Sequence, residues 1–133
     1  MHILLVDDVS DTRHLFSMAF VLAGHRTSNA SSGAEALELF LKHRFDAVLL
    51  DVEMPNINGL KVLESIRQLP FGEQIPVILF SGHHDQEKEK RAKEAGAYAL
   101  LRKPMLPEYV IAVVERAVSE HAINEHAINE HAS

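Results

Sequence analysis

Four apolar segments of this sequence each end in side chains that could take part in chemistry. In chain order these side chains are the Asp7–Asp8 pair, Asp51, Ser81 and Lys103. In an open parallel sheet, binding sites form just beyond the carboxyl ends of the strands. If the four segments are strands of one such sheet, all five side chains lie at a single edge.

Each of these side chains also has an ordinary interpretation when it is taken alone. Asp8 would serve as a helix cap, Ser81 as a hydroxyl in a turn and Lys103 as a surface lysine in a loop. These ordinary roles do not require the side chains to gather at one edge of a sheet. Their predicted coincidence there favours one shared site.

The predicted site combines three carboxylates with a hydroxyl and an amine. Carboxylates gathered in one pocket raise one another's pKa unless a cation lies between them. Oxygen ligands with open water positions suit Mg²⁺, and backbone carbonyls of the loop 52–59 would complete its shell. A metal ion, an ammonium and a hydroxyl together suit a phosphoryl group. A carboxylate can itself be the nucleophile, which gives an aspartyl phosphate.

The elements that must position this site alternate regularly along the chain. Uninterrupted apolar runs indicate strands that are covered on both faces, and hence parallel strands. Segments with apolar residues every three or four positions indicate helices. We therefore expect β–α units in one doubly wound α/β domain. The predicted strands are 3–6, 26–30, 47–50, 77–80 and 97–101, and the predicted helices are about 11–23, 32–41, 60–69, 85–95 and 107–118.

The first predicted helix carries a broad apolar stripe. Leu15, Ala19 and Leu22 recur at helical spacing, and Phe16 and Phe20 lie one step round the helix. A stripe of this width is typical of a helix that is half-sunk in a core.

The composition limits the classes of function that fit the chain. The sequence has 133 residues, 47% of them hydrophobic, which suits a single domain with a sizeable core. It has no cysteine, which excludes disulfides, thiolate zinc sites and cysteine nucleophiles. The net charge of −6 argues against a nucleic-acid surface, and no apolar run approaches the roughly 20 residues of a membrane helix. Because the N-terminus has no signal-peptide pattern, we expect a soluble, cytoplasmic domain.

Residues 120–133 differ from the rest of the chain because they repeat a five-residue unit. A step of five residues turns roughly 140° along a helix, so His121, His126 and His131 are not stacked and a metal-binding interpretation is weak. We expect the domain to comprise 1–119. Residues 120–133 are expected to be a disordered, solvated tail or one added to the natural chain.

The combination of site residues closely resembles the receiver domains of two-component response regulators. The resemblance covers residues 1 to about 119, and the combination is specific although each part alone would be weak. It rests on Asp7-Asp8, the motif Asp51-x-x-Met54-Pro55-x-x-x-Gly59, Ser81 and Lys103-Pro104.

The resemblance implies a flavodoxin-like (βα)5 fold with strand order 2-1-3-4-5, and it implies a role for each acidic residue. Asp51 would be the phosphoacceptor. Asp8 and Asp51 would be the direct carboxylate ligands of Mg²⁺, and Asp7 would act mainly through a metal-bound water. The Glu53 backbone carbonyl would be a third protein ligand.

The resemblance also implies roles for the remaining matched residues and for the partners. Ser81 would be the switch hydroxyl that moves to the phosphoryl group, Lys103 the counter-cation of that group, and the peptide before Pro104 would be cis. A histidine kinase or phosphotransfer protein would phosphorylate the domain, and the product would switch contacts with a downstream effector protein or domain. The domain would not be an enzyme beyond its own phosphorylation and dephosphorylation. It would bind neither nucleic acid nor a membrane, and a homodimer is compatible with the family.

The sequence departs from the family pattern at three positions. The family often has an aromatic residue three positions before the lysine, where this chain has Leu100, although Tyr98 is nearby. Glu53 adds a fourth carboxylate at the edge of the pocket, and Ser81 stands where threonine is commoner.

Other classes of protein fit the sequence less well. A haloacid-dehalogenase-like phosphatase has Asp-x-Asp-Gly-Thr after its first strand, whereas the Asp51–Met54 segment lacks the second aspartate and the Gly-Thr. A flavin- or nucleotide-binding domain needs a first loop rich in glycine or hydroxyl groups, whereas Val9–Asp11 follows two acids and would repel phosphates. A phosphorylation-independent pseudo-receiver, which acts as an interaction module, remains the alternative.

Two further expectations concern the rim of the site. The partner surface should lie on the first, fourth and last helices and the last strand, with Phe16 and Phe20 partly exposed beside Arg13 and His14. Glu53 should pair with the His83 imidazole across the pocket mouth, because a carboxylate–imidazolium pair forms readily near pH 6.5 and excludes water.

Overall fold

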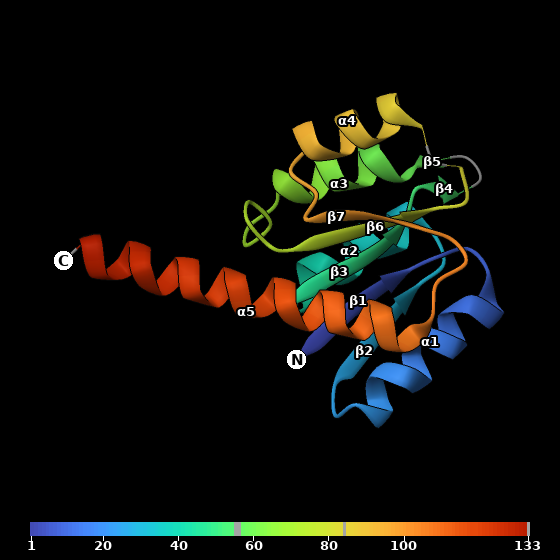
Figure 1. Ribbon diagram of the computed structural model, residues 1–133, viewed down its shortest axis with the longest axis horizontal. Helices are drawn as coiled ribbons and strands as arrows, with labels where there is room; N and C mark the ends of the chain where they lie inside the picture. Colours follow the sequence, from blue (N-terminus) through green and yellow to red (C-terminus); the bar gives the residue numbers. More distant parts are fainter. Residues whose placement is uncertain (55–56, 84, 133) are drawn as a thin grey trace.

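Strands and helices alternate along the chain and form a sandwich in which helices cover both faces of a central sheet (Figure 1). The computed structural model describes residues 1–54, 57–83 and 85–132, and for residues 57 and 125–132 it describes the backbone only. The strands of the main sheet are β1 (His2–Val6), β2 (Arg26–Ala30), β3 (Ala47–Asp51), β6 (Val77–Ser81) and β7 (Ala99–Arg102). The helices are α1 (Ser10–Leu22), α2 (Gly33–Lys42), α3 (Gly59–Arg67), α4 (Gln86–Glu94) and α5 (Pro107–Ala132).

Within the described residues, the main sheet is parallel throughout and has the order β2-β1-β3-β6-β7. Counted along the sheet strands alone, this is the predicted order 2-1-3-4-5, so the predicted flavodoxin-like fold is confirmed. A short antiparallel hairpin of β4 (Glu53–Met54) and β5 (Ile57–Asn58) follows β3 and was not predicted.

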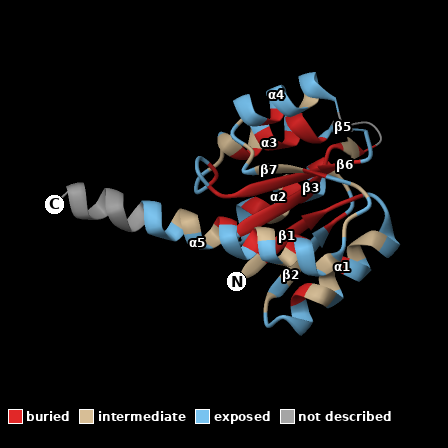
Figure 2. Ribbon diagram, viewed as in Figure 1, coloured by how far each residue is buried: buried red, intermediate tan, exposed pale blue. Residues whose placement is uncertain are grey.

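Both faces of the sheet are buried, which explains why its central strands are apolar except at one end of each strand. On β1, Leu4 and Val6 pack with α2, α3 and α4, whereas Ile3 and Leu5 pack with α1 and α5. Figure 2 shows the buried strands between helices whose outer surfaces are exposed. The core is therefore two apolar layers that the sheet separates.

Local signals in the sequence fix where several helices begin and end. The hydroxyl of Ser32 accepts a hydrogen bond from the Glu35 N–H at the start of α2, and the Asp85 carboxylate caps α4 in the same way. Gly24 and Gly96 have positive φ just after α1 and α4, a conformation that glycine adopts without strain.

The half-buried side chain of Arg67 ties two connections together at the amino-terminal edge of the sheet. Its Nη1 donates to the carbonyls of Gly72 and Ile75, at 3.0 and 2.7 Å, in the connection between α3 and β6. Its Nη2 donates to the Gly96 carbonyl, at 2.6 Å, directly after α4. Arg67 therefore fixes the carboxyl end of α4 to α3.

The position of α1 corrects two expectations. Phe16 and Phe20 are 6% and 0% exposed and belong to the core, so they cannot form the predicted partner surface. Leu15 and Leu22, which were expected in the buried stripe, are exposed. Adjacent helical positions are about 100° apart, and α1 turns its two phenylalanines inward because aromatic rings bury the most apolar area.

The last helix is longer than expected. The backbone of α5 continues through the repeated segment to Ala132 and projects beyond the sheet (Figure 1), whereas residues 120–133 were expected to be a disordered, solvated tail or one added to the natural chain. Alanine and glutamate in the repeat favour a helix. Glu120 accepts hydrogen bonds from the Tyr98 hydroxyl at 2.8 Å and from Arg116 at 3.0 Å. The origin of the repeat stays a prediction. Among the described residues, no helix is both long and apolar enough to cross a membrane.

Candidate functional site

The candidate site lies at the carboxyl edge of the sheet, beyond four neighbouring strands. Asp7 follows β1, Asp51 ends β3, Ser81 ends β6 and Lys103 follows β7. The strands place these residues together because all of them run in the same direction. The order reverses beside β1, which is the position where sites form in open α/β sheets.

The acidic part of the site consists of Asp7, Asp8 and Asp51, whose nearest carboxylate oxygens lie within 4.8 Å of one another. Asp7 and Asp51 are 3% and 1% exposed, whereas Asp8 is exposed. Asp8 does not cap α1, because Val9 occupies the cap position and no side-chain hydrogen bond is made there. The ordinary interpretation of Asp8 as a cap is therefore wrong.

Asp7 has fewer hydrogen-bond partners than its burial requires. Its Oδ1 accepts from the Val9 N–H at 2.9 Å, but its buried Oδ2 has no hydrogen-bond partner within the described part of the chain. Burial raises the pKa of Asp7 to about 6, and the negative charges of Asp51 and Asp8 add to the rise. A buried carboxylate oxygen without a partner, next to two further carboxylates, fits a bound cation.

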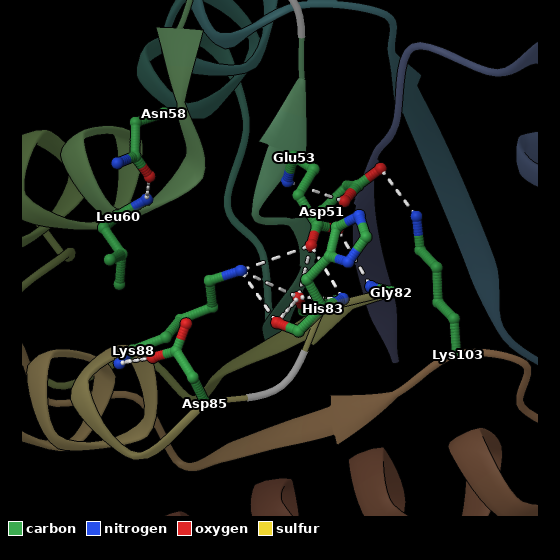
Figure 3. Close-up of polar contacts among 10 residues, drawn as sticks. Asp51, Glu53, Asn58, Leu60, Gly82, His83, Asp85, Lys88 and Lys103 are labelled. Carbon is green, nitrogen blue, oxygen red and sulfur yellow. Dashed lines mark hydrogen bonds and ion pairs between the residues drawn. The ribbon is translucent and has the colours of Figure 1, made fainter.

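Asp51 is the carboxylate that lies between the acidic residues and the lysine. Its Oδ2 is 3.0 Å from the Nζ of Lys103, and its Oδ1 accepts from the Glu53 N–H at 2.9 Å (Figure 3). Burial raises the pKa of Asp51, although these two donors act in the opposite direction. Lys103 is held in turn by its backbone N–H, which donates to the Ser81 carbonyl at 2.9 Å, and its peptide bond to Pro104 is cis.

The loop after Asp51 folds back closely on the strand that it leaves. The Gly59 N–H donates to the Val52 carbonyl at 3.0 Å, and a Cβ at Gly59 would overlap the Asp51 carbonyl oxygen. The Asn58 side chain accepts from the Leu60 N–H at 2.9 Å and caps α3 (Figure 3). Glycine is therefore required here by close backbone approach. Pro55 of the predicted motif lies outside the described residues.

The Glu53 carboxylate is bound by a group of donors that could not be identified from the sequence. It accepts from the Ser81 hydroxyl at 2.5 Å. It also accepts from the backbone N–H groups of Gly82 and His83 at 2.9 and 3.0 Å (Figure 3). The Nζ of Lys88, in the first turn of α4, is 3.3 Å from Glu53 Oε1 and 2.8 Å from the His83 carbonyl oxygen. We call Glu53, Ser81 and Lys88, with these two N–H groups, the Glu53 cluster.

The Glu53 cluster corrects the expected pairing with the His83 imidazole. Glu53 binds the backbone of His83, and its cationic partner is Lys88. Burial opposes ionisation of Glu53, but the hydrogen bonds from Ser81, Gly82, His83 and Lys88 outweigh it and lower the pKa to about 2. No sequence signal separated Lys88 from the other basic residues of α4, which is charged along most of its length.

The two residues considered for an aromatic switch lie apart from the acidic cluster. Leu100 is half-buried and packs against the core layer that contains α4. The Tyr98 hydroxyl donates to Glu120 on α5, so Tyr98 is directed away from Ser81.

The doubly wound sheet defines a flavodoxin-like domain. At the point where the strand order reverses, the acidic pocket, a lysine and a hydroxyl form a site that suits a cation and an anion together. The family of response regulator receiver domains matches residues 3–115, and this chain belongs to that family.

Relatives and solved structures agree with this assignment. The regulatory protein AtoC of Escherichia coli is 36% identical over 115 residues, which are 86% of this chain and 24% of AtoC. The sensor histidine kinase RcsC of the same species is 36% identical over 105 residues, which are 79% of this chain and 11% of RcsC. The chemotaxis protein CheY4 of Vibrio cholerae superposes with a TM-score of 0.84 at 30% identity, covering 87% of this chain and 97% of CheY4. The chain thus spans a quarter or less of these two curated relatives.

Proposed function

We propose that this domain is a phosphoacceptor that receives a phosphoryl group on Asp51 from the phosphohistidine of a histidine kinase or phosphotransfer protein. The observation that supports this most directly is the environment of Asp51. A buried carboxylate next to two further carboxylates has one oxygen 3.0 Å from the Lys103 ammonium. An attacking oxygen, a place for a metal ion and a cation for the transferred group are thus adjacent.

In the proposed reaction, a carboxylate oxygen of Asp51 attacks phosphorus and forms the new P–O bond. The P–N bond of the donor breaks, and its electron pair leaves with the imidazole nitrogen, which takes up a proton. Lys103 moves from the carboxylate to the phosphoryl oxygens and compensates their charge. The Ser81 hydroxyl donates a hydrogen bond to the same group, which stabilises the phosphorylated state.

The acidic residues fit the Mg²⁺ that the family implies, as the unpartnered Oδ2 of Asp7 indicates. We propose that Asp8 and Asp51 bind it through their carboxylates, Glu53 through its backbone carbonyl, and Asp7 through water. The ion supplies positive charge for the phosphoryl oxygens during transfer.

Incubation with acetyl phosphate, followed by intact-protein mass spectrometry, tests the proposed function. We expect the mass of one phosphoryl group in the presence of Mg²⁺, located on the peptide that contains Asp51, and no addition in EDTA. We also expect no turnover of general phosphate esters, since the domain is proposed to act only on its own aspartyl phosphate. No addition from either acetyl phosphate or a panel of donor kinases would favour the phosphorylation-independent interaction module.

We further propose that α1 provides the surface on which the phosphodonor protein docks, in place of the buried Phe16 and Phe20. Leu15, Met18 and Leu22 follow one another at helical spacing and are exposed on α1, which begins two residues after Asp8. An exposed apolar stripe of this kind suits the apolar face of a partner helix. Met18→Glu should slow transfer from a donor kinase and leave phosphorylation by acetyl phosphate unchanged. Leu41→Glu, on the exposed face of α2, is the matched control.

We also propose that the domain acts in the cytoplasm and signals through contacts with an effector protein or domain. The net charge of −6 supports protein contacts over nucleic-acid contacts.

A further inference from the structure

The donors that bind the Glu53 carboxylate would also suit an oxygen of a phosphoryl group. The Ser81 hydroxyl donates to one carboxylate oxygen of Glu53. Two backbone N–H groups and the Lys88 ammonium point at the same carboxylate (Figure 3). Charge-assisted hydrogen bonds of this kind are shorter and stronger than neutral ones. Glu53 is therefore bound firmly within the site, although it is neither one of the three clustered aspartates nor a core residue.

The Ser81 hydroxyl cannot serve Glu53 and a phosphoryl group at the same time. A serine hydroxyl has one proton to donate. Its Oγ lies 2.5 Å from Glu53 Oε1 and 2.7 Å from the His83 carbonyl oxygen, so both nearby acceptors belong to the protein itself. A hydrogen bond from Ser81 to a phosphoryl group on Asp51 requires the hydroxyl to leave both acceptors, of which the Glu53 carboxylate is the nearer and the charged one.

We propose that Glu53 and Lys88 form an internal latch that competes with the phosphoryl group for the Ser81 hydroxyl. This inference rests on the proposed phosphorylation of Asp51. Glu53 is the competing acceptor, and Lys88 is a positioning residue that holds the Glu53 carboxylate in place. The latch lowers the fraction of the protein in which Ser81 is available, and it thereby weakens binding of an anion at Asp51.

The latch also connects the site to α4. The Lys88 ammonium reaches Glu53 and the His83 carbonyl oxygen, and the Lys88 N–H donates to the Asp85 cap at 2.6 Å. The same residue therefore belongs to the first turn of the helix and to the Glu53 cluster. Transfer of Ser81 from Glu53 to a phosphoryl group removes one of the donors that fix the Glu53 carboxylate beside Lys88.

A double-mutant cycle with the beryllium trifluoride anion, a phosphoryl mimic that binds to carboxylates, tests the latch. Affinity is measured with Mg²⁺ by NMR titration, following the amide signals of Gly82 and His83. We expect Glu53→Ala to bind the anion about ten-fold more tightly than the parent, since a hydrogen bond to a charged acceptor no longer competes. Lys88→Gln should tighten binding by a smaller factor.

The second arm of the cycle separates the latch from a general effect of charge. Removing Glu53 also removes a negative charge near the anion, and this effect persists without the Ser81 hydroxyl. In a Ser81→Ala background, we therefore expect Glu53→Ala to tighten binding by less than three-fold. In a Glu53→Ala background, Lys88→Gln should no longer tighten binding. Glu87→Ala and Lys90→Gln, on the exposed surface of α4, are the matched controls for loss of each charge.

An equal effect of Glu53→Ala with and without the Ser81 hydroxyl would overturn the latch, as would tightening by Lys88→Gln in the absence of Glu53. Failure of the proposed function has a different signature. If Asp51 is not the acceptor, the parent itself does not bind the anion, or Asp51→Asn binds it as tightly as the parent does.

Discussion

Asp7 and Glu53 lie at the same edge of the sheet but in opposite electrostatic environments. Asp7 is buried with one N–H partner and one unpartnered oxygen, and burial raises its pKa to about 6. Glu53 is more exposed, and its several donors lower its pKa to about 2. The buried Asp7 carboxylate thus lacks a compensating partner, whereas the Glu53 carboxylate is already compensated by donors of the protein itself.

This difference has a direct meaning for stability, because a shifted pKa changes the free energy of unfolding with pH. The raised pKa of Asp7 favours the folded state below about pH 4, and this contribution is lost as the pH rises through 6. The lowered pKa of Glu53 stabilises the fold above its ordinary value of 4.5, and this contribution is lost as the pH falls towards 2. The two carboxylates should therefore respond to neutralisation with opposite signs.

The largest expected effect concerns the carboxylate between these two environments. Asp51→Asn should abolish incorporation of phosphate from acetyl phosphate, because an amide is a poor nucleophile and a poor ligand for Mg²⁺. Incorporation is measured by intact-protein mass spectrometry. Asp11→Asn, on the exposed surface of α1, is the control and should behave as the parent does. A hydroxylamine-labile modification of Asp51→Asn at the parent level would contradict the assignment.

Neutralising Asp7 should stabilise the protein when Mg²⁺ is absent. Asp7→Asn keeps an oxygen for the Val9 N–H and removes a buried charge, so the free energy of unfolding at pH 7.5 should rise by about 2 kcal/mol. Urea denaturation in EDTA measures the change. The gain should disappear near pH 3.5, where the parent carboxyl is already protonated. A gain that is the same at both pH values would indicate better packing and not relief of charge.

Binding of Mg²⁺ should depend on pH because protons compete for the same carboxylates. With the pKa of Asp7 at about 6, the affinity should fall about ten-fold between pH 7 and pH 5. Titration of Mg²⁺ at several pH values, followed by the backbone amide shifts of residues 7–8 and 51–54, measures this dependence. Asp7→Asn should flatten it. A steep dependence that persists in this variant would place the titrating group elsewhere.

The smallest expected effect is the loss of stability when Glu53 is neutralised. Glu53→Gln should lower the free energy of unfolding at pH 7 by about 1 kcal/mol, a value reduced by the partial solvent exposure of the side chain. The loss should diminish as the pH falls from 4.5 towards 2, because the parent side chain then becomes neutral as well. An increase in stability at pH 7 would remove the contrast with Asp7.

Much of the fold follows from the sequence because both faces of the sheet are covered. Val48 and Leu79 lie in the uninterrupted apolar runs 47–50 and 77–80, and no helix of ordinary amphipathic pattern would show such a run. Polar residues at the ends of these strands then belong to one edge as a consequence of parallel direction. The positions of Asp7, Asp51, Ser81 and Lys103 could be predicted for this reason.

Other features depend on packing that no local pattern encodes. A broad apolar stripe on α1 does not say whether Phe16 or Leu15 points inward, since the two differ by about 100°. The hairpin β4–β5 has two residues in each strand, too few to show alternation. Lys88 becomes part of the site only because the loop after Ser81 returns α4 towards Glu53.

The two ends of α4 are attached in different ways. Its carboxyl end is fixed by the Arg67 guanidinium through the Gly96 carbonyl, at the edge of the sheet opposite the site. Its amino end is held by Lys88, through contacts that include the side chain of Glu53. A helix that is fixed at one end and released at the other pivots about its fixed end. We therefore expect any displacement of α4 to grow along the helix from Glu94 towards Gln86, so that the residues nearest the site travel farthest.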